Sequence, residues 1–90
     1  MPDKKPEITL ETVRLIVNRA IAPLTVEPSQ ADEDLQELGM DSLGHVAVIV
    51  ELEKEFGIQI PEEGLLFSQM NTLRKITEMA SGAEQMEEGA

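Results

Sequence analysis

The sequence predicts an all-α fold, a small antiparallel bundle of three main helices plus a short third helix, with a long loop between helices one and two. Three observations predict it. Ninety residues allow one small core. Apolar residues recur at helical spacing in separate segments of the chain. Aromatic residues make up only 2% and cysteine is absent, so the core is aliphatic and has no disulfides. We expect a flexible lead-in over residues 1–8, the domain over 9–81, and a disordered acidic tail over 82–90.

The first helix is expected to begin after Thr9, a good capping residue, and to end before Pro23. Its apolar positions recur every three or four residues, which is typical of a helix with one buried face. These positions are Leu10, Val13, Ile16, Val17, Ala20 and Ile21. The segment from Leu24 to Asp41 then reads as a long connection, whose leucines and Val26 are expected to dip into the core. Within it, Leu35 and Leu38 form a short helical turn that Gly39 closes.

Helix two is expected to run from about Ser42 to Phe56. One side carries an apolar set that we assign to the core, namely Val46, Ile49, Val50 and Phe56 with Leu52 at its flank, while Glu53 stays at the rim. The other side shows Leu43, Ala47 and Val48 near its start and Glu51, Lys54 and Glu55 near its end. This side is too apolar in its first turns for a solvated surface. The remaining chain covers it, or it is a docking patch.

The last third of the chain alternates turns with short helical patterns. Gly57 ends helix two, and a brief strand at 57–60 has no evident partner strand. A short helix is expected over about Leu65 to Gln69, with Leu65, Leu66 and Phe67 supplying apolar contacts. Asn71 or Thr72 then caps a final helix that ends at Ser81-Gly82. Its inward positions are Leu73, Ile76, Met79 and Ala80.

The charge is strongly negative. Lys and Arg number 7 against 18 Asp and Glu, a net charge of −11, and Lys54 is the only fixed cation between Ala20 and Leu73. Such a surface repels nucleic acid and anionic membranes, and it either steers basic protein partners or serves solubility alone. Residues 1–7 are polar and no apolar run spans a membrane, so we expect a cytoplasmic monomer without a membrane span.

The sequence does not indicate an active site. His45 lies one helical turn after Ser42, but no acid is placed to orient it, and we expect it to face solvent. The acids at 32–34 lack the spacing of a calcium loop, so we predict no metal site and no catalytic residues.

Ser42 is the residue around which the sequence is organised. It falls at the start of helix two, where backbone N–H groups lack intrahelical partners. Asp41 or Ser42 could cap that helix, and on local sequence alone capping is the simpler interpretation for Ser42. The same position also suits a phosphate, because the free N–H groups and the helix dipole favour negative charge there.

The wider pattern is more specific. The segment Asp32 to Leu43 (DEDLQELGMDSL) precedes an amphipathic helix that ends in EKEFGIQIP at residues 53–61. Over roughly residues 9 to 81 the chain resembles an acyl carrier protein of the free-standing type. The resemblance implies 4′-phosphopantetheine from coenzyme A, esterified to Ser42, whose thiol carries acyl groups as thioesters. Asp41 is then part of the motif that a phosphopantetheinyl transferase recognises. The aliphatic interior between helices two and three would shelter a bound chain.

The resemblance also implies partner-recognition residues on helix two, for which we take Leu43, Ala47, Val48 and Glu51. Expected partners are acyltransferases, ketosynthases or acyl ligases with basic or apolar docking patches. Helix two departs from the fatty-acid carrier pattern because Gly44, Ala47 and Val48 are uncharged. This favours a polyketide or other specialised pathway over fatty-acid synthesis. The alternatives are a peptidyl or aminoacyl carrier and, from a different class, an acidic helical interaction module in which Ser42 is only a cap.

Overall fold

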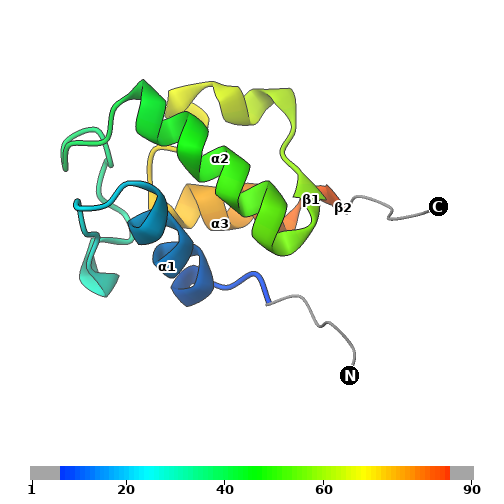
Figure 1. Cartoon of the computed structure of the whole chain (residues 1–90), viewed down its shortest axis with the longest axis horizontal. Helices are drawn as coiled ribbons and strands as arrows, with labels where there is room; N and C mark the ends of the chain where they lie inside the picture. Colours follow the sequence, from blue (N-terminus) through cyan, green and yellow to red (C-terminus); the bar gives the residue numbers. More distant parts are fainter. Residues whose placement is uncertain (1–6, 86–90) are drawn as a thin grey trace.

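The computed structural model describes residues 7–85, and its fold is mostly helical with three α-helices (Figure 1). The α-helices are α1 (Leu10–Ala20), α2 (Ser42–Phe56) and α3 (Leu73–Ser81), and α1 packs against both of the others. Short 3-10 turns occupy η1 (Pro28–Gln30), η2 (Glu62–Leu65) and η3 (Phe67–Gln69). The long loop between α1 and α2 is present as predicted. The antiparallel arrangement and the division into domain, lead-in and tail stay predictions.

The helix ends follow the chemistry of their capping residues. The Thr9 and Thr72 hydroxyls accept hydrogen bonds from the amides of Thr12 and Lys75 at 3.2 and 3.0 Å, which caps α1 and α3. Gly57 ends α2 with φ of 64°, a left-handed conformation that costs glycine little. The predicted bounds of α2 are confirmed.

The core is aliphatic and lies between the three helices. It includes both predicted stripes, with Val13, Val17, Leu73 and Ile76 fully buried. The long loop is tied to this core because Val26 and Leu35 are buried and Leu24 and Leu38 pack against it.

Hydrogen bonds also hold the loop. The Val26 amide donates to Asn18 Oδ1 at 2.7 Å, and the Leu35 amide donates to the Asn71 carbonyl at 2.7 Å. Asn18 lies off the apolar stripe of α1, so its role could not be read from periodicity. The loop that precedes Ser42 is therefore tied to the helical core at two points.

Two expectations for the last third of the chain are wrong. The expected helix at Leu65 to Gln69 is instead the pair of turns η2 and η3, and Leu65 and Leu66 are exposed rather than in contact with the core. The buried groups of this segment are Gly64 and Met70. A Cβ on Gly64 would overlap the Ile60 side chain, so close packing requires glycine here.

The brief strand does have a partner. β1 (Ile58–Gln59) pairs antiparallel with β2 (Glu84–Gln85), so that Ile58 faces Gln85 across the pair (Figure 1). The sequence gives no sign of this pairing because two polar residues carry no strand pattern. The rest of the predicted tail, residues 86–90, lies outside the described residues, as do residues 1–6 of the lead-in.

Candidate functional site

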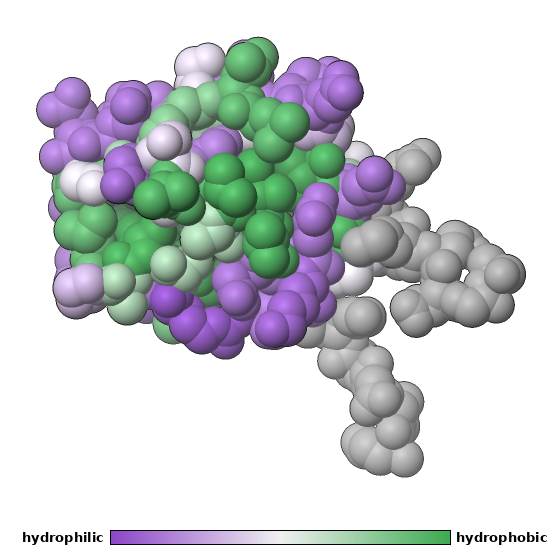
Figure 2. Space-filling model, turned by 45° about the horizontal axis from the view of Figure 1, so that its top comes forward, coloured by the Kyte–Doolittle hydropathy of each residue, from purple (hydrophilic) through white to green (hydrophobic). Residues whose placement is uncertain are grey.

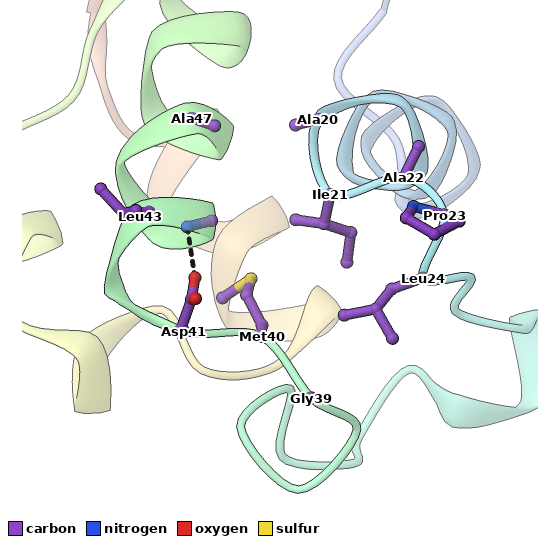
Figure 3. Close-up of a pocket in the computed structure, with 11 residues that line it drawn as sticks. Ala20, Ile21, Ala22, Pro23, Leu24, Gly39, Met40, Asp41, Leu43 and Ala47 are labelled. Carbon is purple, nitrogen blue, oxygen red and sulfur yellow. Dashed lines mark hydrogen bonds between the residues drawn. The ribbon is translucent and has the colours of Figure 1, made fainter.

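Ser42 is the first residue of α2, and its side chain is exposed. The capping question is resolved by its neighbour, because Asp41 Oδ1 accepts a hydrogen bond from the Gly44 amide at 2.9 Å (Figure 3). Within residues 7–85, no hydrogen bond involves the Ser42 hydroxyl. The Ser42 hydroxyl therefore does not cap α2, and it is accessible to modification.

The backbone before Ser42 is held by a glycine turn, a backbone hydrogen bond and a buried side chain. Gly39 has φ of 114°, which favours glycine, and the Met40 amide donates to the Leu35 carbonyl at 2.9 Å. The Met40 side chain is buried beneath the start of α2. Ser42 lies at the N-terminus of α2, where backbone N–H groups lack intrahelical partners and the helix dipole favours a negatively charged group.

An open cleft of about 340 Å³ lies between the end of α1 and the start of α2 (Figure 3). Asp41 and Leu43, the two neighbours of Ser42 in sequence, line it, while Ser42 itself does not. Small residues line part of the cleft. Ala20 of α1 and Ala47 of α2 lie at the same end of it (Figure 3). Met40, Ile21 and Leu24 form the apolar part of the lining.

The predicted recognition residues divide into three groups by their exposure. Leu43 is 79% exposed beside Ser42, as expected for a docking contact. Ala47 is half-buried in the cleft, and Glu51 is half-buried in an ion pair with Arg19. Val48 is fully buried against the core, so its assignment to an exposed docking face is wrong.

The predicted inward face of α2 is confirmed for Ile49, Leu52 and Phe56 and is wrong for two valines. Val46 and Val50, assigned to the core, are 51% and 52% exposed. The buried positions are His45, Val48, Ile49, Leu52 and Phe56. Apolar side chains surround most of the first three turns of α2, so periodicity alone does not select a face. Packing against α1 and the η2–η3 turns selects it.

The prediction that His45 faces solvent is also wrong. His45 is only 4% exposed, and its Nε2 lies 2.7 Å from the Gly64 carbonyl oxygen, to which it donates because a carbonyl only accepts. The ring stacks on Phe67 with centroids 4.8 Å apart. His45 thus joins α2 to the η2–η3 turns, and it is held by Gly64 rather than directed at Ser42.

Two ion pairs, neither of which lines the cleft, lower the pKa of a carboxyl group. Arg74 holds the pKa of the Asp32 carboxyl below its usual value through a hydrogen bond, and Arg14 lowers the pKa of Glu11 in the same way. In the described part of the chain, no cluster of His, Cys, Asp or Glu is arranged to hold a metal ion. No helix there is long and apolar enough to cross a membrane.

An apolar surface surrounds the start and middle of α2. Figure 2 shows a hydrophobic area bordered by hydrophilic residues on the side that faces up in Figure 1. Its large exposed apolar residues come from α2, from η2 and from the residue that follows η2. They are Leu43, Val46, Val50, Leu65 and Leu66. We call these five residues the apolar face. Val46, Val50, Leu65 and Leu66 were not among the predicted recognition residues.

Comparison with known proteins gives one family. Residues 11–80 match the family described as "Phosphopantetheine attachment site". A probable acyl carrier protein of Streptomyces coelicolor is 33% identical over 61 residues, which cover 63% of this chain and 67% of that protein. The acyl carrier protein of Zymomonas mobilis is 35% identical over 60 residues, or 63% and 73% of the two chains.

A relative that is named for a different cargo also matches. The D-alanyl carrier protein of Streptococcus pyogenes is 42% identical over 57 residues, which cover 62% of this chain and 68% of that protein. These alignments span about two thirds of each relative's length. No solved structure matches.

Proposed function

This chain belongs to the phosphopantetheine attachment site family, and we propose that Ser42 is the residue that carries the group. Members of this family are carriers without catalytic activity, and the cofactor is covalently attached 4′-phosphopantetheine. When bound, the group supplies a terminal thiol that holds acyl cargo as a thioester. A chain without cysteine gains its only thiol in this way.

One observation carries the assignment to Ser42, namely that Asp41 caps α2 and leaves the neighbouring hydroxyl exposed and unpaired within the described residues. The position also fits a phosphodiester, because the dipole at the N-terminus of α2 favours negative charge. The interaction-module alternative required Ser42 to be the cap, and that role belongs to Asp41. Asp41 acts here by fixing the first turn of α2 in the conformation that a transferase meets.

The test is an intact mass before and after incubation with coenzyme A, Mg²⁺ and a broad-specificity phosphopantetheinyl transferase. The parent chain should gain one phosphopantetheine, and Ser42→Ala should gain none. Ser68→Ala is the matched control, because Ser68 is also exposed but lies in the η3 turn. The control should gain the group like the parent. A modified Ser42→Ala chain would refute the assignment.

We propose an acyl cargo from a polyketide or other specialised pathway. The apolar start of α2 supports this choice over fatty-acid synthesis, since Gly44 and Ala47 are uncharged and Leu43 is exposed. Partners are then the transferase and the acyltransferases, ketosynthases or ligases that load and use the arm. A cytoplasmic monomer stays the expectation.

A second candidate is an aminoacyl or peptidyl carrier, which the similarity to D-alanyl carrier proteins favours. The two candidates differ in the enzyme that loads cargo onto the phosphopantetheine arm. The phosphopantetheinylated chain should gain the mass of an acyl group from a malonyl transferase under the first proposal. A gain only from an amino-acid-activating ligase would establish the second.

A further inference from the structure

Arg19 in the last turn of α1 reaches across to two acids of α2. Its Nη2 lies 3.2 Å from Glu51 Oε1 and 3.0 Å from Glu55 Oε2. The arginine side chain is 57% exposed, and the two glutamates are 28% and 35% exposed. One cation therefore bridges two carboxylates that are four residues apart on the same face of α2.

The third acid of α2 is also engaged. Glu53 Oε2 accepts a hydrogen bond from the Ile60 amide at 2.9 Å, which ties it to the segment after α2. The remaining charged residue of the helix is Lys54, which is exposed. Each acid of α2 is thus engaged by a neighbouring group, whereas Lys54 on α2 and the acids Asp41, Glu62 and Glu63 near it are exposed.

Exposed ion pairs add little to stability. Their effect on association is larger, because the local potential decides which charged surfaces approach productively. A basic partner that docks on the apolar face would have to compete with Arg19 for Glu51 and Glu55. It would also meet the like charge of Lys54, which opposes the attraction of the exposed Glu62 and Glu63 of η2.

We propose that Arg19 is a specificity-determining residue, which engages Glu51 and Glu55 so that they are not available to a basic enzyme and the apolar face docks enzymes with an apolar surface. The inference rests on the proposed function, since the docked enzymes are those that reach the group on Ser42. The arginine acts through the two glutamates and does not itself contact the partner. Its removal should convert α2 into a helix that attracts basic surfaces.

The test measures the dissociation constants of the chain for two phosphopantetheinyl transferases, one with an apolar carrier-docking surface and one with a basic surface. All variants carry Ser42→Ala, so that docking is measured whether or not Ser42 is the modified residue. Titrations at about 0.05 M and about 0.5 M NaCl separate charge effects from apolar contact, because salt screens exposed charges.

The parent background should bind the apolar-surfaced enzyme with an affinity that changes less than about twofold between the two salt concentrations. Arg19→Gln should tighten binding to the basic-surfaced enzyme about threefold at low salt, and the gain should vanish at high salt. Arg19→Lys keeps the charge and should behave like the parent.

Arg74→Gln is the matched control. Arg74 is similarly exposed and pairs with Asp32 outside the α2 surface, so its loss changes the net charge equally without releasing Glu51 or Glu55. Equal effects of Arg19→Gln and Arg74→Gln would overturn the proposal, because net charge alone would explain them. Tight, salt-sensitive binding of the parent to the basic-surfaced enzyme would also overturn it. The mass experiment on Ser42 fails or succeeds independently of either result.

Discussion

The orientation of α2 predicts opposite outcomes for two valines that lie two residues apart. Val48 is fully buried and Val46 is 51% exposed. Replacing Val48 by alanine removes two methyl groups from the core, at about 0.8 kcal/mol of transfer free energy each, and leaves a cavity. We expect a loss of about 2–3 kcal/mol in the free energy of unfolding. For a domain of this size, that lowers the melting temperature by about 10–15 °C.

Val46→Ala is the matched control, with the same chemical change on the same helix. It should change stability by less than about 0.5 kcal/mol, because little buried area is lost and alanine favours the helix more than valine does. The chain has no tryptophan or tyrosine, so unfolding is followed by far-ultraviolet circular dichroism in urea and on heating. Equal losses for the two variants, or a larger loss for Val46→Ala, would show that α2 is rotated relative to the structure.

Three further predictions concern the cap, the acid stability and the charge of the domain. Asp41→Ala should lower the free energy of unfolding by about 1 kcal/mol, because the hydrogen bond to the Gly44 amide is lost. Asp41→Asn should retain most of the stability of the parent, since asparagine also caps helices. A urea titration in which both variants match the parent would contradict the capping role of Asp41. Arg74 lowers the pKa of Asp32 below its ordinary 3.8, so this pair stabilises the fold above that pH and the contribution is lost as the pH falls through the folded-state pKa. Asp32→Asn should therefore flatten the acid side of a plot of urea midpoint against pH, and an unchanged slope would count against the pair. With a net charge of −11, the melting temperature should rise with NaCl as self-repulsion is screened, whereas a salt-independent value would refute this.

The helices and their ends were predictable because each depends on local chemistry. Thr9 and Thr72 cap, Gly57 terminates, and the stripe of α1 has one clear apolar side, so sequence and structure agree there. These features need no knowledge of distant residues. The same holds for Ser42 at the start of α2.

The errors lie where distant contacts decide. The first turns of α2 are apolar on several sides, so only packing against α1 and the η2–η3 turns buries Val48 and exposes Val46. His45 is buried because its Nε2 donates to the Gly64 carbonyl and its ring stacks on Phe67, about twenty residues away, while its Nδ1 has no hydrogen-bond partner within the described residues. The β1–β2 pair and the bridge from Arg19 to α2 likewise join segments that no local pattern connects.

The central claim is that Ser42, among the four serines of the chain, carries the phosphopantetheine. The most direct measurement is to cleave the modified parent chain and locate the added mass by tandem mass spectrometry of the fragments. We predict the whole added mass on Ser42, in the fragment that contains Gly39 to Leu43. The same mass on a fragment with Ser29, Ser68 or Ser81 would contradict the account.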